Sequence, residues 1–333
     1  MTKPKILLLG EIEHAHASWQ ALSTTTEILT PTSTTRPAFL AECRSGRLDG
    51  VTAAYRTFAS ASITGPWDAE LVAALPASLR FCAHNGAGYD QIDVAACSAR
   101  EPPLRVSNVP TAVDDATADT AVFLMLGALR GFGAGMAGLR EGAWRAGVAG
   151  LGRDPQGKTL GILGMGGIGR NMMRKCEAFG MRTVYHNRRR LEAEAAGGAE
   201  WVGFEELLAR ADVLSLNLPL NKNTRHIIST PEFAKMKRGV VIVNTARGAV
   251  MDEDALVKAL ESGQVGSVGL DVFEEEPKVH PGLLKNPNTM LIPHMGTYTV
   301  ETMEKMEEWC IGNVKSAIET GKLVSPVPEQ ADL

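Results

Sequence analysis

The sequence predicts an α/β protein with two doubly wound parallel sheets, one domain being inserted into the other. Short apolar runs alternate with helical stretches along most of the 333 residues, which is typical of parallel sheets. A glycine-rich turn at residues 164–169 starts a second β-α series well inside the chain. A long amphipathic stretch closes the chain and can return to the first domain. A chain of this length can hold two such domains.

The first domain is expected to comprise residues 1–109 and 299–333. One of its helices begins at Pro37 and ends at Gly46, because proline is favoured in the first turn of a helix and glycine just after its end. Its strands are predicted at four apolar runs, residues 5–9, 49–54, 79–83 and 104–106.

The second domain is expected at residues 110–298. A long helix with an apolar face spans residues 113–130 and is followed by a glycine-rich segment, 131–142, and a polar connection, 152–158. Strands are predicted at six apolar runs, residues 159–163, 182–186, 213–216, 240–244, 266–271 and 290–292. The closing helix has apolar residues at helical spacing, namely Val300, Met303, Met306, Cys310, Val314 and Ala317.

Composition excludes several classes of protein. A hydrophobic content of 44% and a charged content of 22% are those of an ordinary globular protein. The net charge of −4 leaves no basic surplus for nucleic acid. No signal peptide and no apolar run of about 20 residues is present, so no membrane span is expected. The five cysteines include no C-x-x-C pair and predict buried thiols in the cytoplasm, without a disulfide framework or a metal site.

The glycine turn indicates a dinucleotide site. Gly164, Gly166 and Gly169 form G-x-G-x-x-G between an apolar strand and a helix. The first glycine permits the tight turn, the second lets a pyrophosphate approach the backbone, and the third lets the helix pack on the strand. Such turns also occur for structural reasons alone, but both flanks here match the nucleotide-binding context.

The end of the next strand indicates which dinucleotide is bound. An NAD site usually has Asp or Glu there for the ribose 2′-hydroxyl, whereas this chain has Asn187 followed by Arg188, Arg189 and Arg190. Without a carboxylate a 2′-phosphate is not repelled, and a guanidinium can bind it with two hydrogen bonds. We therefore expect NADP, with NAD possible if the arginines are only a solvated helix start.

Three polar side chains that follow strands form a candidate catalytic set. Arg247 follows the strand VVIVN, Asp271 and Glu276 lie in GLDVFEEEP, and His294 lies in LIPHMGTY. Ligands of open α/β sheets bind at the carboxyl ends of strands, so these residues are well placed for carboxylate binding and proton transfer. Singly, each also has an ordinary interpretation, as a loop arginine, a wet turn or a core histidine.

These strings resemble the D-isomer-specific 2-hydroxyacid dehydrogenases. VNTARG, GLDVFEEEP and PHMGT behind GMGGIG carry the resemblance, which extends to NGAGYDQID at residues 85–93 and covers nearly the whole chain. YHNR and PHMGT are similar to the fungal glyoxylate/hydroxypyruvate reductase and D-mandelate dehydrogenase branch. The resemblance implies a Rossmann cofactor domain inserted into a flavodoxin-like substrate domain. It also implies catalytic roles for Arg247, Glu276 and His294, while Asn187 departs from the family's ribose-binding aspartate.

The resemblance also implies which residues bind ligands. Cofactor contacts are expected at Gly164, Gly166, Gly167, Ile168, Gly169, Asn187, Arg188, Arg189, Leu218, Pro219, Thr224, Thr245, Ala246, Arg247, Asp271, His294 and Gly296. Substrate contacts are expected at Arg56, Thr57, Asn85, Gly86, Ala87 and Arg247. Asn85 and Gly86 can equally serve turn formation alone. Whether the pocket includes His14, His16, Trp19 and Tyr298, or these side chains only cap and pack, stays open.

The expected activity is the NADPH-dependent reduction of small 2-oxo acids, glyoxylate and hydroxypyruvate, to D-2-hydroxy acids. His294 would donate the proton, and the Glu276 carboxylate would favour the imidazolium and hold the ring. One alternative is a D-mandelate-type enzyme for larger aromatic 2-oxo acids. Another is a dinucleotide-sensing scaffold, since C-terminal-binding-protein corepressors resemble the same family. A homodimer through the helix at 113–130 and the segment after it is expected.

Overall fold

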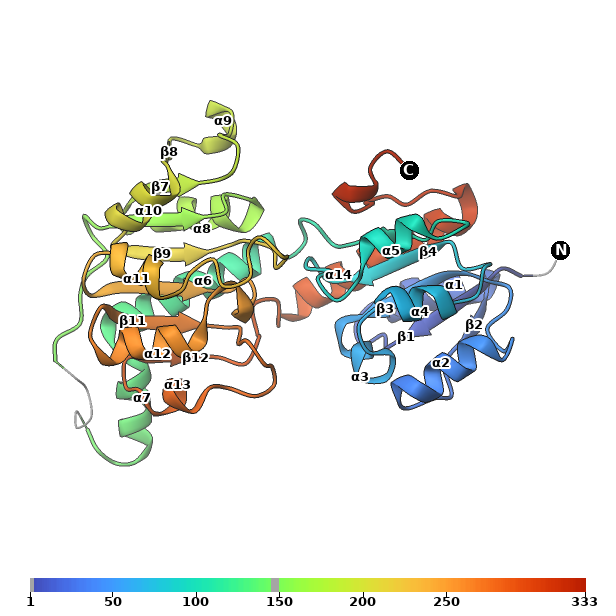
Figure 1. The fold of residues 1–333 in the computed structure, drawn as a ribbon, viewed down its shortest axis with the longest axis horizontal. Helices are drawn as coiled ribbons and strands as arrows, with labels where there is room; N and C mark the ends of the chain where they lie inside the picture. The colour runs from blue at the N-terminus through green and yellow to red at the C-terminus, as the bar shows by residue number, and fades with distance from the viewer. Residues whose placement is uncertain (1–2, 145–149) are drawn as a thin grey trace. The chain divides into compact units, whose positions relative to one another are not determined.

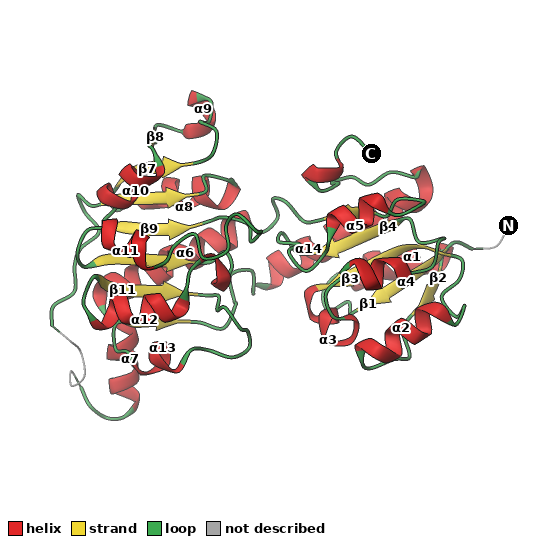
Figure 2. Ribbon diagram, in the orientation of Figure 1, coloured by secondary structure: helices red, strands yellow, loops and turns green. Residues whose placement is uncertain are grey.

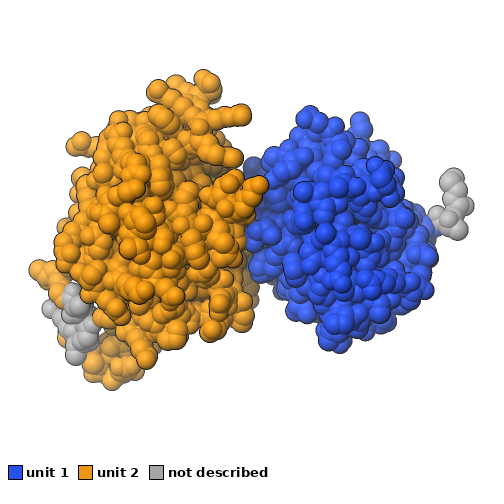
Figure 3. Space-filling model, viewed as in Figure 1, with its two compact units in different colours: residues 1–113, 299–333 blue, residues 114–298 orange. Residues whose placement is uncertain are grey.

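The chain divides into two compact units. The computed structural model describes residues 3–144 and 150–333. Unit 1 consists of Met1–Val113 and Thr299–Leu333, and unit 2 is Asp114–Tyr298 (Figure 3). The first boundary lies four residues beyond the expected one at 109/110, and the second lies at the expected place, 298/299.

Unit 1 contains a five-stranded parallel sheet. The strand order is β2-β1-β3-β4-β5, which is the flavodoxin-like order (Figure 1). The strands are β1 (Lys5–Leu9), β2 (Glu27–Leu29), β3 (Val51–Thr57), β4 (Phe81–Asn85) and β5 (Arg105–Ser107). The helices are α1 (His16–Thr25), α2 (Arg36–Arg44), α3 (Ala61–Thr64), α4 (Ala69–Ala74), α5 (Val94–Ala99) and α14 (Val300–Thr320), with short 3-10 turns at Phe58–Ser60 and Pro328–Gln330.

Both faces of this sheet are buried. Side chains of β1, β3 and β4 point alternately to two cores, as expected for strands between helical layers. One core joins the sheet to α1 and α14, and the other joins it to α2, α4 and α5. Helix α14 is capped by the Thr299 side chain and ends at Gly321 in the left-handed conformation, so its ends are set by the sequence.

Unit 2 contains a seven-stranded parallel sheet of Rossmann order. The order is β12-β11-β10-β9-β6-β7-β8, so the winding direction reverses between β6 and β9. The strands are β6 (Thr159–Leu163), β7 (Arg182–His186), β8 (Glu200–Trp201), β9 (Val213–Leu216), β10 (Val240–Asn244), β11 (Val265–Leu270) and β12 (Thr289–Leu291). The helices are α6 (Asp114–Arg130), α7 (Phe132–Arg140), α8 (Gly167–Glu177), α9 (Ala193–Ala196), α10 (Phe204–Arg210), α11 (Thr230–Lys235), α12 (Glu253–Glu261) and α13 (Pro281–Lys285), with a 3-10 turn at Gly248–Val250.

Helices cover both faces of the unit 2 sheet (Figure 2). Helices α6 and α8 share one core with β6, β7, β9 and β10, and α10, α11 and α12 share the other. The strand β10 is buried at every residue, which explains its almost pure Val and Ile sequence. The doubly wound α/β prediction is confirmed for both units.

The elements differ from the prediction in a few places. The strands β2 and β8 were not expected, because three and two residues at a sheet edge carry no clear pattern. The glycine-rich segment after α6 contains the helix α7, and a Cβ on Gly133 would lie 2.5 Å from the carbonyl oxygen of Thr289. Its glycine therefore allows close packing on β12. Among the described residues no single helix could cross a membrane, and only the pair α6 and α7, bent by 77°, has sufficient length and apolar character.

Candidate active site

Arg247 lies on a short loop after β10 that is held by a buried asparagine. Asn244 is fully buried, and its side chain accepts a hydrogen bond from Ala246 N–H (3.0 Å) and donates one to the carbonyl oxygen of Arg247 (3.0 Å). The next residue, Gly248, packs directly on another backbone segment, because a Cβ there would lie 1.9 Å from the carbonyl carbon of Phe273. The loop conformation is thus fixed on both sides of Arg247.

Glu276 and His294 form a hydrogen-bonded pair. His294 Nδ1 lies 2.7 Å from Glu276 Oε2, and the other carboxylate oxygen accepts a hydrogen bond from Phe273 N–H (3.0 Å). Burial would raise the pKa of Glu276, but the bonds from His294 and Phe273 and the positive charges of His294 and Arg247 lower it below its ordinary value. The pair and Arg247 therefore interact through one carboxylate, and Glu276 stays ionised at neutral pH.

Asp271 fixes the loop that carries His294. It is 1% exposed, and its two carboxylate oxygens accept hydrogen bonds from Met295 N–H (2.5 Å) and Gly296 N–H (2.8 Å). Its carbonyl oxygen accepts from His294 N–H (2.7 Å). These bonds hold His294 at a φ of +53°, a backbone conformation that non-glycine residues rarely adopt and that persists where the surroundings impose it. Burial raises the pKa of Asp271, although the bonds from Met295 and Gly296 and the charge of His294 oppose this.

The glycine turn has the geometry that a pyrophosphate requires. Gly164 has a φ of +98°, and Gly169 approaches the carbonyl oxygen of Gly164 so closely that a Cβ would lie 2.9 Å from it. In contrast, a Cβ on Gly166 would meet no atom within 4 Å. Gly166 caps the N-terminus of α8, where Gly167 and Ile168 begin the helix and first-turn N–H groups are available to an anion.

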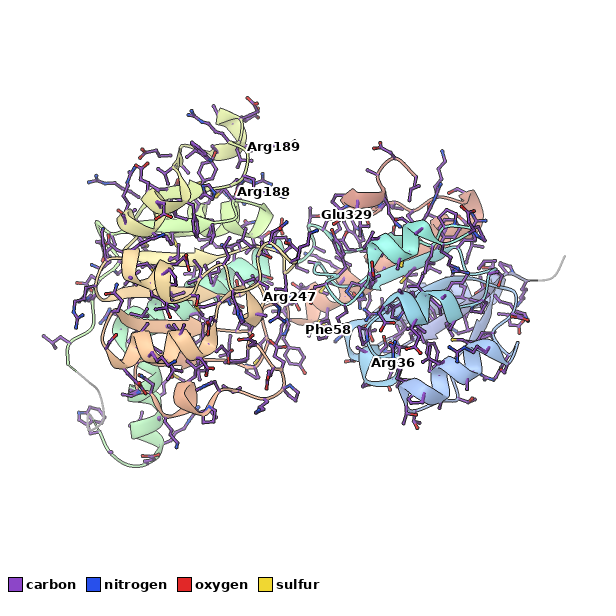
Figure 4. The ribbon with its side chains drawn as sticks, viewed as in Figure 1. Arg36, Phe58, Arg188, Arg189, Arg247 and Glu329 are labelled. Carbon is purple, nitrogen blue, oxygen red and sulfur yellow. The ribbon has the colours of Figure 1, made fainter. Side chains whose placement is uncertain are left out.

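The residues after β7 combine a structural amide with exposed arginines. Asn187 Oδ1 accepts a hydrogen bond from Met165 N–H (2.7 Å), so its side chain holds the glycine turn. Arg188, Arg189 and Arg190 are exposed, and none of them pairs with another described residue. Figure 4 shows Arg188, Arg189 and Arg247 at the edge of unit 2 where the strands end.

The other expected cofactor residues lie at the same edge. Thr245 is 8% exposed, and its buried hydroxyl has no partner among the described residues. The Thr224 hydroxyl donates to the carbonyl oxygen of Pro219 (2.6 Å) and fixes the loop that contains Leu218. The open approach at Gly166, the hydroxyl of Thr245 and the exposed arginines fit a dinucleotide phosphate chain and its ribose.

The expected substrate residues of unit 1 lie at the ends of β3 and β4. Arg56 is 0% exposed and its guanidinium contacts His84 and Gln91, because β3 continues three residues beyond its predicted end and carries Arg56 into the interior. Thr57 is half-buried, with a hydroxyl that has no partner among the described residues. Asn85 donates to the hydroxyl of Tyr55 (2.9 Å).

The structure also places the residues that were left open. His16 begins α1, and Trp19 packs edge-on against Tyr55 with 5.5 Å between ring centroids. The backbone N–H of His14 donates to Glu307 of α14 (2.9 Å). Tyr298 is 70% exposed. Sequence reasoning missed Asn244, Gly248 and His84, although an asparagine that ends a strand of Val and Ile was a visible signal for the first.

A Rossmann unit that carries arginine, glutamate and histidine at its strand ends defines a dinucleotide-dependent oxidoreductase. Residues 122–296 match the family "D-isomer specific 2-hydroxyacid dehydrogenase, NAD binding domain". The chain is 54% identical to 4-methyl-2-oxopentanoate reductase A of Aspergillus oryzae, over 99% of both chains. It is 49% identical to glyoxylate reductase 1 of Saccharomyces cerevisiae, over 98% of this chain and 95% of the relative. The protein belongs to the D-isomer specific 2-hydroxyacid dehydrogenases and is an oxidoreductase.

Solved structures agree with this assignment. A glyoxylate reductase from Paecilomyes thermophila has a TM-score of 0.96 and 55% identity, over 99% of this chain and 100% of that one. The holo form of Rhodotorula graminis D-mandelate dehydrogenase has a TM-score of 0.93 and 33% identity, over 98% of both chains. An NADPH-dependent glyoxylate/hydroxypyruvate reductase from Sinorhizobium meliloti, in complex with NADP and malonate, has a TM-score of 0.85 and 30% identity, over 98% of both chains. The expected family branch is confirmed, and the scaffold alternative is set aside.

Proposed function

We propose that this protein reduces small 2-oxo acids, glyoxylate and hydroxypyruvate, to D-2-hydroxy acids with NADPH, and that His294 is the proton donor. The observation that carries the proposal is the His294–Glu276 contact of 2.7 Å beside Arg247. A carboxylate at this distance from Nδ1 orients the imidazole ring for proton transfer. The similar glyoxylate reductases support the substrate class.

The three side chains have distinct tasks. The Arg247 guanidinium binds the substrate carboxylate and polarises the neighbouring carbonyl. His294 donates a proton to the carbonyl oxygen as negative charge develops there. The bound dinucleotide supplies the hydride that C2 receives. The C2–O double bond thus becomes a single bond, a C–H and an O–H bond form, and His294 recovers its proton from solvent. In the reverse direction a neutral His294 acts as the base, so oxidation favours higher pH.

A larger 2-oxo acid is the second candidate substrate. The similar 4-methyl-2-oxopentanoate reductase acts on a branched 2-oxo acid according to its name, and a D-mandelate dehydrogenase is a close structural neighbour. A panel of glyoxylate, hydroxypyruvate, 4-methyl-2-oxopentanoate and benzoylformate, assayed with NADPH, separates the two candidates. The highest kcat/KM for glyoxylate or hydroxypyruvate supports the first. Absence of turnover on all four would overturn the reductase proposal.

The preference for NADP rests on the residues after β7. Asn187 offers no carboxylate that would repel a 2′-phosphate, and Arg188 and Arg189 are exposed at the strand ends. The similar Sinorhizobium enzyme is described as NADPH-dependent, which supports the assignment. The test is the ratio of kcat/KM for NADPH to that for NADH. A ratio of one or less would show that the arginines are only a solvated helix start and that NAD is used.

We also propose that the protein is a cytoplasmic homodimer. All five cysteines are buried and unpaired, which suits a reducing compartment. On α7 the side chains of Phe132, Met136 and Leu139 recur at helical spacing and are 45%, 45% and 58% exposed. Such an apolar stripe is covered when two copies associate. Sedimentation at micromolar concentration is expected to give a dimer, and Met136→Glu a monomer. A monomeric unmodified protein would reject the dimer.

A further inference from the structure

Arg56 is a buried charge without a carboxylate partner. Its guanidinium contacts His84 Nδ1 (2.9 Å) and Gln91 Oε1 (2.7 Å) and lies over the ring of Trp67, 5.8 Å from the centroid. Among the described residues no Asp or Glu forms an ion pair with it. Burial lowers the pKa of Arg56, while Cys82 and Asp90 act in the opposite direction, yet a guanidinium stays protonated in proteins. A charge placed so unfavourably calls for a specific role.

The contact with Arg56 determines where His84 carries its proton. A guanidinium has only donors, so Nδ1 of His84 must accept, and the proton of the neutral ring is on Nε2. Nε2 lies 3.0 Å from the carbonyl oxygen of Gly88 and donates to it. His84 is 1% exposed, so the ring has no alternative position in solvent. The ring therefore links the buried charge of β3 to the loop after β4.

This loop, residues 86–88, has every carbonyl fixed to the body of unit 1. The oxygen of Gly86 accepts from Val109 N–H (2.9 Å), that of Ala87 from Asn108 Nδ2 (2.7 Å), and that of Gly88 from His84. In a planar trans peptide the N–H points opposite to the preceding C=O. The three bonds therefore set the directions of the N–H groups of residues 87, 88 and 89. Across the described part of the chain, nothing accepts from the N–H of Ala87 or Gly88.

We propose that Arg56 and His84 are positioning residues for substrate binding. Arg56 locks the tautomer and orientation of His84, and His84 holds the Gly88 peptide so that successive backbone N–H groups of the loop converge on the carboxylate of the 2-oxo acid. The inference rests on the proposed function for the identity of the ligand. It replaces the expectation that Arg56 itself contacts the substrate.

Two substitutions of His84 separate its bond to Arg56 from its bond to Gly88. In His84→Asn the amide oxygen takes the place of Nδ1 and can accept from Arg56, but the side chain does not reach Gly88. In His84→Gln the amide nitrogen takes the place of Nε2 and can donate to Gly88 O, while the bond to Arg56 is lost. Loss of one hydrogen bond to the loop should raise the KM for glyoxylate about three- to tenfold in His84→Asn, with kcat and the KM for NADPH unchanged. His84→Gln should keep a KM close to the unmodified value.

Arg36→Gln is the matched control. Arg36 is another multiply bonded arginine of unit 1 (Figure 4), but its hydrogen bonds go to Thr64, Pro66, Asp68 and Glu70, which lie outside the loop. This variant should melt at a lower temperature with an unchanged KM. Equal KM values in His84→Asn and His84→Gln, at equal melting temperatures, would overturn the proposal. Thermal stabilisation by oxalate measures binding without turnover. If the unmodified enzyme reduces no 2-oxo acid, the proposed function fails, and a weaker oxalate effect in His84→Asn than in His84→Gln still supports the positioning role.

Discussion

The two functional loops of this protein work with different chemical groups. In unit 2 the proposed reactive groups are the side chains of Arg247, Glu276 and His294, and hydrogen bonds hold the backbone around them. In unit 1 the proposed binding groups of residues 86–88 are backbone N–H groups, and the side chains of His84 and Asn108 hold the carbonyls of that loop. Side chain and backbone thus exchange roles between the two units.

The difference also appears in how each unit treats buried charge. Asp271 is 1% exposed and compensated by two backbone N–H groups, as a buried carboxylate requires. Arg56 is equally buried, but its hydrogen bonds go to the neutral groups of His84 and Gln91. The carboxylate of unit 2 fixes its loop directly, whereas the guanidinium of unit 1 acts through a histidine ring. We therefore expect replacement of the proposed reactive side chains of unit 2 to lower activity. In unit 1 we expect weaker substrate binding when the side chains that hold the loop are replaced.

The largest effect is expected from His294→Gln. This change removes the proposed proton donor of unit 2 and should lower kcat about 10²–10⁴-fold, because general acid catalysis contributes that much. NADPH binding, followed by fluorescence titration, should be nearly unchanged. His280→Gln is the matched control, since His280 also pairs with a carboxylate, Asp254 (3.0 Å), but away from the site. A kcat reduced equally in both variants would contradict the role of His294. Unit 2 would then no longer be distinguished from unit 1 by a reactive side chain.

The next effect concerns side chains that bind rather than react. Replacing both Arg188 and Arg189 by Gln should raise the KM for NADPH about ten- to a hundredfold, because a charge-assisted hydrogen bond contributes about 1.5–3 kcal/mol. The KM for NADH should change little. Arg190→Gln, one residue further along, serves as the control and should leave both values unchanged. Equal weakening of NADPH and NADH by the double variant would mean that the arginines support the fold.

A third prediction tests whether the backbone of the Arg247 loop in unit 2 is held as tightly as the loop 86–88 in unit 1. Gly248→Ala places a methyl group into the Phe273 peptide, and we expect a loss of about 1–3 kcal/mol of unfolding free energy together with a lower kcat. Gly312→Ala, at an exposed position of α14 with no atom within 4 Å, should be neutral or slightly stabilising. Urea denaturation and the glyoxylate assay measure both. Unchanged stability and kcat in Gly248→Ala would show that the Arg247 loop adapts.

The strand bounds of unit 2 are predicted more closely from the sequence than those of unit 1. The reason is where polar residues lie relative to the strand ends. The strands β6, β7, β9 and β10 have the predicted bounds, because buried parallel strands are continuous apolar runs that end at polar residues. The candidate catalytic residues Arg247, Glu276 and His294 follow the strands β10, β11 and β12 in the same way, so the pattern that locates a strand also locates the candidate site. In unit 1, β3 and β4 begin and end two or three residues later than predicted, since polar residues such as Arg56 and Asn85 lie inside the strand ends.

The supports could not be predicted, because they depend on contacts between distant segments. Asn108 meets Ala87, and Gly248 meets Phe273, only after the chain has folded. The role of Asn187 shows the same limit: its substitution for an acid was visible, but its bond to Met165 N–H was not. The resemblance implied substrate contacts at Asn85, Gly86 and Ala87, but the directions of the N–H groups of this loop can be inferred only from the carbonyls that the fold holds.

The smallest expected effect is the pH dependence that Glu276 of unit 2 contributes to stability. The pKa of Glu276 in the folded protein is lowered from its ordinary value of 4.5, since the bonds from His294 and Phe273 outweigh burial. A carboxyl group with a lowered pKa contributes stability above its unfolded pKa and loses that contribution as the pH falls through the folded value.

The unfolding free energy of the unmodified protein should therefore exceed that of Glu276→Gln at neutral pH, and the difference should decrease once the pH falls below about 4.5. In contrast, the bond between Nε2 and the Gly88 carbonyl that His84→Asn removes joins no carboxylate, so its loss should not add a carboxyl titration to the difference between the unmodified protein and His84→Asn. Urea denaturation of the three proteins from pH 7 to below pH 4 measures both differences. A Glu276 difference that is constant over this range would show that the carboxylate is held no more tightly in the folded protein than in the unfolded chain, and the distinction between a charged support in unit 2 and a neutral one in unit 1 would then be lost.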